Sequence, residues 1–224
     1  DLFVENDNVY MKTVKGPLKV DCIYRRLDDN FLDPKAFFKG SLIGVPGLFK
    51  CWRKGNVGIL NAVGTGIADD KVVYSYVNKM IVYYLGEQPV LNQVETYLCH
   101  DEIQKDYVIE NISKLVVKPA NASGGYGIMI GPKAPKEERE EVIKKIKKNP
   151  REYIAQPLET LSTAPTITKD NIEPRHLDLR PFILSGKSTY VTTGGLTRVA
   201  LRKGSTIVNS SQGGGSKDTM VVDI

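Results

Sequence analysis

No stretch of the sequence is apolar enough or biased enough to indicate a membrane span or a disordered tract. The 224 residues contain no run of 18 consecutive apolar side chains, so we expect no transmembrane helix and no membrane partner. No signal peptide, internal repeat or low-complexity segment is recognised. With 41% hydrophobic and 25% charged residues, the composition is that of a globular chain, and we predict a cytoplasmic location.

Cysteine and histidine are scarce, which excludes several kinds of site. Cys22, Cys51 and Cys99 are scattered and odd in number, so we expect neither a disulfide framework nor a zinc site. The two histidines leave little room for a metal triad or a Ser/His pair. We interpret His100 as structural. For His176, which shares a predicted strand face with charged residues, a structural and a functional role both stay open.

Three common catalytic or nucleotide motifs are also absent. Gly186-Lys187-Ser188 ends like a P-loop, but Pro181 occupies the position of the required first glycine. Gly125-Tyr126-Gly127 begins like a dinucleotide fingerprint, but Ile130 occupies the position of the third glycine. No GxSxG element is present. A P-loop, a Rossmann site and an α/β-hydrolase serine are therefore not expected.

Charge of one sign is only slightly in excess. The formal net charge of +5 and the pI near 8.9 suit an anionic ligand but do not by themselves indicate a nucleic acid. Residues 134–150 are rich in lysine, and a nucleic-acid-binding module that uses them is an alternative hypothesis. They lack interleaved aromatic residues, and their acids precede their lysines as a helix dipole favours. We interpret them as a helix with a solvated face and predict no nucleic-acid partner.

The hydrophobic patterns predict an α+β chain. Helices are expected at 69–85, with Asp69 or Asp70 as N-cap and Gly86 as terminator, and at 134–150. Strands are expected at 19–24, 115–119, 127–131, 151–157, 176–184 and 194–201. The second and third of these flank a glycine-rich loop, so we predict that they form a hairpin over a ligand.

One theme of anion binding emerges from these elements. Lys118 ends a strand just before the loop Ser123–Gly127, so a fixed cation would lie beside backbone N–H donors, as a polyphosphate requires. Taken alone, the loop is better explained as a tight β-hairpin turn. A second glycine segment with Lys71 opens the 69–85 helix, another natural anion site. Gln156, in a later strand, could contact an adenine edge.

The charged residues of the C-terminal third suggest phosphoryl chemistry. Oxygen and cationic side chains there could hold Mg²⁺ and neutralise a transferring phosphoryl group. These residues are Asp178, Arg198, Asn209, Lys217 and Asp218.

Several long ungapped motifs resemble the circularly permuted ATP-grasp family of bacteria, type 2. They are RRLDDNFLDP, SLIGVPGL, NAVGTGIADDK, VVKPANASGGYGIMIG, YIAQPLETLSTAPT, EPRHLDLRPFIL and GGLTRVALRKGSTIVNSSQGGGSKDT. More distantly, their order is similar to that in glutathione synthetase and glutathionylspermidine synthase. The resemblance implies a permuted, glutathione synthetase-like ATP-grasp fold with mixed or antiparallel sheets, flanking helices and a glycine-rich lid loop.

The resemblance also implies roles for individual residues. ATP would be bound by Lys71, Lys118, Ser123, Gly124, Gly125, Tyr126, Gly127, Ala155, Gln156 and Pro157. Substrate would be bound by Arg25, Arg26, Asp28, Asp29, Asn209, Ser210, Gly213 and Gly214. The catalytic residues would be Arg198 and Lys217, with Asp178 as a metal or ribose ligand. Without the family, Arg25 to Asp29 are equally explained as a surface ion-pair loop.

The implied activity is an ATP- and Mg²⁺-dependent carboxylate–amine ligase that forms an acylphosphate from small-molecule or peptide substrates. Residues 1–110 would belong to the substrate or central domain, 111–160 to the lid, and 161–224 to the ATP-grasp core. Ala122 and Ser123 stand where related synthetases carry a metal-binding glutamate. The family's other metal motif precedes the first matched segment, so we expect an N-terminal part to be missing. The alternative is a nucleotide-binding fragment or scaffold without turnover.

Overall fold

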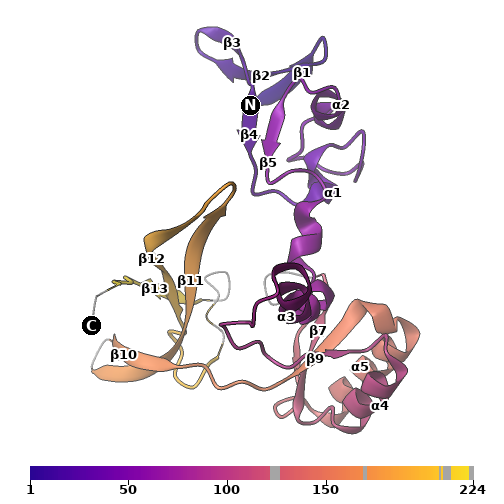
Figure 1. Ribbon diagram of the computed structural model, residues 1–224, viewed down its shortest axis with the longest axis vertical. Coiled ribbons are helices and arrows are strands. Elements are labelled where there is room, and N and C mark those ends of the chain that lie inside the picture. Colours follow the sequence, from indigo (N-terminus) through magenta and orange to yellow (C-terminus); the bar gives the residue numbers. More distant parts are fainter. Residues whose placement is uncertain (122–126, 169–170, 207, 209–212, 222–224) are drawn as a thin grey trace. The chain divides into compact units, whose positions relative to one another are not determined.

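The computed structural model describes residues 1–121, 127–168, 171–206, 208 and 213–221 (Figure 1). The chain folds into two compact units, Asp1–Val90 and Leu91–Ile224. Helices and mostly antiparallel sheets occur in both, so the predicted α+β class is confirmed. Among the described residues, no helix has the length and apolar character that a membrane crossing requires.

The first unit contains an antiparallel sheet, a parallel strand pair and four short or medium helices. The sheet has the order β1-β2-β3, and β4 pairs in parallel with β5. The strands are β1 (Leu2–Glu5), β2 (Asn8–Thr13), β3 (Gly16–Lys19), β4 (Cys22–Tyr24) and β5 (Gly58–Leu60). The helices are α1 (Asp29–Leu32), α2 (Leu48–Arg53), the 3-10 helix η1 (Thr65–Asp69) and α3 (Lys71–Leu85). A core around Val9, Leu48 and Cys51 joins α2 to the strands.

Asp33 organises the centre of this unit although it is a charged residue. Its side chain is only 1% exposed. Its Oδ1 accepts hydrogen bonds from the N–H groups of Lys35 (2.8 Å) and Gly47 (3.0 Å), and its Oδ2 accepts one from Phe49 (3.0 Å). The N-cap of α2 is Gly47, which has no side chain to cap the helix. Asp33 therefore caps α2 from 14 residues away.

Helix α3 confirms the helix predicted at 69–85. Asp70 is its N-cap and accepts a hydrogen bond from the N–H of Val72, and Gly86 ends it in the left-handed conformation at φ +67°. None of the side chains of Lys71–Leu85 is buried. The apolar side chains of this helix, Tyr83 and Tyr84 among them, therefore do not form a core of their own.

The second unit contains a four-stranded sheet of order β6-β9-β7-β8. These strands are β6 (Tyr97–Leu98), β7 (Leu115–Pro119), β8 (Met129–Ile130) and β9 (Tyr153–Pro157). Helices α4 (Glu102–Glu110) and α5 (Lys136–Lys148) pack on one face, where Val108 and Ile146 meet Leu115, Val117 and Ala155 (Figure 1). Because side chains alternate along a strand, Val116, Lys118, Ile154 and Gln156 lie on the opposite face.

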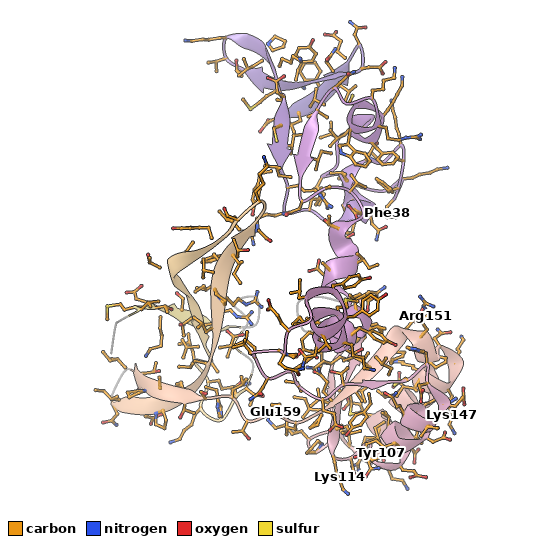
Figure 2. The ribbon with its side chains drawn as sticks, viewed as in Figure 1. Phe38, Tyr107, Lys114, Lys147, Arg151 and Glu159 are labelled. Atoms are coloured by element: carbon orange, nitrogen blue, oxygen red, sulfur yellow. The ribbon has the colours of Figure 1, made fainter. Side chains whose placement is uncertain are left out.

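Helix α5 carries the lysine run as a solvated face. Lys136 pairs with Glu140 and Lys145 with Glu141 at i,i+4 spacing, and only Ile146 of this helix is buried. Lys147 points away from the ribbon (Figure 2). After α5, the 3-10 helix η2 (Pro150–Glu152) leads into β9. These contacts are those of an ordinary surface helix.

A second sheet of the same unit has the order β10-β11-β12-β13. The strands are β10 (Thr163–Ile167), β11 (Ile172–Ser185), β12 (Thr189–Val199) and β13 (Gly215–Lys217). Strands β11 and β12 form a long hairpin (Figure 1). The pairing of β10 with β11 ends at His176. Pro181 lies beyond the part of β11 that pairs with β10, so its missing N–H removes no hydrogen bond to that strand. It lies beside a register shift in the pairing of β11 with β12.

The boundary between the two compact units does not coincide with the predicted domain boundaries. The two compact units separate between Val90 and Leu91, whereas the resemblance implies boundaries near residues 110 and 160. The assignment of residues 111–160 to a lid stays a prediction. The three cysteines are free thiols, with Cys51 and Cys99 buried and Cys22 exposed.

Candidate functional site

The structure joins two predicted ATP-binding residues, Lys118 and Gln156, in one hydrogen-bonded group. They come from adjacent strands, because Val116 of β7 lies opposite Gln156 of β9. Lys118 Nζ donates to Gln156 Oε1 at 2.6 Å, and Gln156 Nε2 donates to Thr96 Oγ1 at 2.8 Å. Gln156 is buried, with 7% exposure, and Lys118 is partly buried. An ammonium group thus lies at the end of β7 with a neutral partner.

The predicted hairpin around the glycine loop is confirmed, although most of the loop lies outside the described residues. Val116 and Val117 of β7 pair with Ile130 and Met129 of β8. Of the loop residues expected to bind ATP, Ser123, Gly124, Gly125 and Tyr126 are not described. Gly127 is described, with φ +72°, and a Cβ atom there would lie 3.0 Å from Pro119. The lid function of this loop stays a prediction.

Ala155 and Pro157 continue β9 on either side of Gln156. Ala155 is fully buried in the core beneath α4 and α5, so only its backbone could contact a ligand. Its Cα lies opposite Val117 of β7 and Tyr97 of β6.

Lys71 belongs to the first unit, as the first residue of α3. Burial lowers the pKa of its ammonium group, and the nearby carboxylates of Asp70 and Asp69 partly offset this. A lysine that loses solvation at a helix N-terminus is suited to an anionic partner. Its role in phosphate binding stays a prediction.

The predicted substrate residues Arg25 to Asp29 form a network within the first unit. The Arg25 side chain is 8% exposed, and it donates to the carbonyl oxygens of Asn61 (2.5 Å), Ala62 (2.7 Å) and Leu27. The Oδ1 atom of Asp29 lies 2.6 Å from Arg25 Nη2 and forms an ion pair with it. Among the described residues, this oxygen accepts no hydrogen bond. The other carboxylate oxygen, Oδ2, accepts a hydrogen bond from the N–H of Gly64.

The remaining two residues of that segment differ in their surroundings. Asp28 caps α1 by accepting from the N–H of Asn30 at 3.0 Å. Arg26 is exposed. The contacts of Arg25, Asp28 and Asp29 thus give this segment a structural task, whereas its role in substrate binding stays a prediction.

The two predicted catalytic residues, Arg198 and Lys217, lie on opposite faces of their sheet. Arg198 lies opposite Ser216, and Thr197 lies opposite Lys217, so the alternation of side chains separates them. Lys217 Nζ donates to Pro165 O at 2.6 Å and to Thr166 Oγ1 at 3.3 Å, which links the two outer strands of the sheet. The structure therefore does not bring Arg198 and Lys217 together.

Arg198 instead forms a two-pronged ion pair with Asp178, directly opposite it in the ladder. Its Nε donates to Asp178 Oδ1 at 2.9 Å, and its Nη2 donates to Oδ2. The hydrogen bond to Arg198 lowers the pKa of Asp178, and the same bond raises the pKa of Arg198. Asp178, predicted as a metal ligand, therefore has both oxygens committed to a guanidinium group.

This ion pair predicts a specific pH dependence of stability. The folded pKa of Asp178 lies below its ordinary value of 3.8, so its contribution is complete above that value and is lost as the pH falls through the lower folded pKa. Asp178→Asn should lower the unfolding free energy at neutral pH, and the difference from wild type should shrink below pH 3.8. Urea unfolding at a series of pH values measures this. An equal difference at every pH would contradict the ion-pair account.

Two further predicted substrate residues, Asn209 and Ser210, lie outside the described residues, while Gly213 and Gly214 precede β13. Throughout the ranges that the structure describes, no group of three or more His, Cys, Asp or Glu side chains could hold a metal ion. His176 Nδ1 contacts the Leu161 carbonyl oxygen at 2.8 Å, which supports the structural alternative for this histidine.

Comparison with known proteins decides the family. The model of circularly permuted ATP-grasp proteins of type 2 matches residues 1–200. The chain belongs to this family. Its members share the ATP-grasp fold class, which agrees with the α+β architecture and with the resemblance found in the sequence.

Curated relatives are longer than this chain. It is 56% identical over 223 residues to an uncharacterized protein of Synechocystis sp., covering 99% of this chain and 46% of that protein. It is 51% identical to an uncharacterized protein of Mycobacterium tuberculosis, covering 99% and 40%. The chain thus spans about half or less of these relatives.

A third relative carries the name of an enzyme. The chain is 47% identical over 222 residues to a protein of Frankia casuarinae named "Putative glutamate--cysteine ligase 2-2", covering 99% of this chain and 26% of that protein. Since only a quarter of that protein is matched, its name describes the whole and does not assign an activity to the matched part.

Two residues that are important for the structure, Thr96 and Asp33, carry no recognisable signal in the sequence. Thr96 lies outside every motif, and only the fold reveals it as a partner of Gln156, 60 residues away. Asp33 stands directly before Pro34 in the motif RRLDDNFLDP. A carboxylate before a proline is a common turn signal, so no local pattern indicates its burial.

Proposed function

We propose that this chain is an ATP-dependent carboxylate–amine ligase that acts through an acylphosphate. The observation that carries the proposal is the Lys118–Gln156 contact at the end of β7, in a chain that belongs to the ATP-grasp family. A partly buried ammonium group held by a neutral amide is suited to a phosphate oxygen. The glutathione synthetase-like arrangement, with residues 111–160 as a lid, belongs to the same proposal.

The proposed chemistry has two balanced steps. A carboxylate oxygen attacks the γ-phosphorus of ATP, forming a C–O–P bond while ADP leaves. An amine nitrogen then attacks the acyl carbon and loses a proton, forming an amide while inorganic phosphate leaves. The first step brings a carboxylate and the ATP phosphates together, so cationic side chains must offset the repulsion.

The described residues supply part of that charge. Lys118 would contact the ATP phosphates. Lys71, the first residue of α3, is proposed separately as a phosphate-binding lysine, on the resemblance to the family. Arg198, held in a fixed direction by Asp178, would neutralise the transferring group. Lys217 would support the sheet through β10 and not act beside Arg198, since the two face opposite ways.

The described residues fit ATP better than they fit Mg²⁺. Lys118 and Lys71 are donors for phosphate, whereas the one acidic residue proposed as a ligand, Asp178, is bound to Arg198. Magnesium, when bound with ATP, would neutralise phosphate charge. No step is assigned to it from the residues described.

A second candidate function follows from that mismatch and from the length of the relatives. The chain would bind ATP without turnover, as a nucleotide-binding fragment or scaffold. The described part offers no acidic cluster for a metal, and the chain covers 46% of the Synechocystis protein.

Trapping with hydroxylamine separates the two candidates. The 224-residue chain is incubated with Mg-ATP, hydroxylamine and mixed amino acids that include L-glutamate, a choice prompted by the name of the Frankia relatives. A ligase should convert an acylphosphate into a hydroxamate, with one ADP formed per hydroxamate. ATP binding without ADP or hydroxamate would contradict the ligase and favour the second candidate.

A further inference from the structure

A chain of three hydrogen bonds runs from Lys118 into the body of the second unit. Lys118 Nζ donates to Gln156 Oε1, Gln156 Nε2 donates to Thr96 Oγ1, and Thr96 Oγ1 donates to the carbonyl oxygen of Val94 at 3.0 Å. All four residues belong to the second unit, Leu91–Ile224.

The contacts of Gln156 with Lys118 and with Thr96 each determine the orientation of its amide group independently. An ammonium group is only a donor, so the atom facing Lys118 must be the amide oxygen. The Thr96 hydroxyl spends its proton on Val94, so it must accept from the amide nitrogen. Hydrogen bonds that run in one direction also strengthen one another by polarisation.

This geometry gives Gln156 a task other than contact with an adenine edge. Its oxygen and one of its N–H groups are already used, and it is 7% exposed. A glutamate of the same length could hold Lys118 equally well, but its negative charge would neutralise the ammonium group. The amide holds the cation without adding an opposing charge.

We propose that Gln156, oriented by Thr96, is a positioning residue that holds Lys118 toward the phosphates of ATP without cancelling its charge. The inference rests on the proposed function, because the ligand is the nucleotide of that site. In this account Gln156 favours anionic ligands only indirectly, because it positions the ammonium group of Lys118. Neither Gln156 nor Lys118 needs to touch the adenine base.

The test compares the affinities of the 224-residue chain for ATP and for adenosine, which lacks phosphate. Gln156→Glu keeps the size of the side chain, and we expect it to weaken ATP binding by about tenfold, equivalent to about 1.4 kcal/mol. Its affinity for adenosine should change by less than about twofold, a factor worth about 0.4 kcal/mol.

Thr96 variants test the orienting contact without a change of charge. Thr96→Val removes the hydroxyl that accepts from Gln156, and we expect ATP binding to weaken by about threefold, equivalent to about 0.6 kcal/mol. Thr96→Ser keeps the hydroxyl and should bind ATP as the wild type does. If the role of Thr96 were merely structural, both variants would have a lower melting temperature, and their affinities for ATP would not differ in this way.

The outcomes separate the inference from the function on which it rests. If the wild type does not bind ATP, the proposed function fails and the inference falls with it. If ATP binds and Lys118→Met weakens it, but Gln156→Glu does not, only the inference is overturned. An equal loss of ATP and adenosine affinity in Gln156→Glu would also overturn it, because it would show contact with the base.

Discussion

Lys118→Met is expected to weaken ATP binding by about a hundredfold, equivalent to about 2.7 kcal/mol. The side chain keeps its length and apolar stem but loses the ammonium group that Gln156 holds at 2.6 Å. Charge-assisted contacts to phosphate are among the strongest polar contacts in proteins, and they strengthen where solvent is partly excluded. Equilibrium titration of the chain with ATP measures the change.

Lys114→Met is the matched control for this variant. It removes the same charge from the same unit, one residue before β7 begins, but Lys114 is exposed and points away from the ribbon (Figure 2). Its effect on ATP affinity should stay below about twofold because exposed charges are screened. Equal losses in the two variants would show that net charge governs binding, and this would contradict a specific site at Lys118.

Asp33→Ala is expected to lower the unfolding free energy of the first unit by about 4 kcal/mol. Three N–H groups, those of Lys35, Gly47 and Phe49, lose their part-buried hydrogen bonds together, and an unsatisfied buried group costs about 1–3 kcal/mol. One of these groups belongs to the first turn of α2, which has no cap of its own. Water that enters the space left by the carboxylate would recover part of the loss.

Fluorescence of Trp52 during urea unfolding measures this loss locally. Trp52 is the single tryptophan of the chain, belongs to α2 and stacks on Phe49 with ring centroids 5.5 Å apart. Asp28→Ala is the control, since it removes an exposed N-cap from α1 at an expected cost of about 1 kcal/mol. If Asp33→Ala were no more costly than Asp28→Ala, the long-range cap would not be important.

The sequence was most informative where local chemistry decides the structure. Asp70 and Gly86 mark the ends of α3 because capping and the left-handed terminator act within a few residues. The hairpin of β7 and β8 followed from two apolar runs around a glycine loop. The family was recognisable from ungapped motifs, which the match over residues 1–200 confirms.

Contacts between distant segments could not be predicted in the same way. The link of Gln156 to Thr96 depends on which strands become neighbours, and the sequence offers no local sign of that choice. The separation of Arg198 from Lys217 depends on register, where a shift by one residue exchanges the two faces of a strand. Arg25 could be predicted as functional or as structural, and its burial was the missing observation.

The most direct test of the central claim is amide hydrogen exchange with and without ATP. If the second unit binds the nucleotide at Lys118, ATP should slow exchange in peptides that cover Leu115–Pro119 and Tyr153–Pro157. Peptides that cover β1 to β3 should exchange at the same rate in both conditions, and Lys118→Met should abolish the protection. Protection confined to other segments, or none at saturating ATP, would contradict the account.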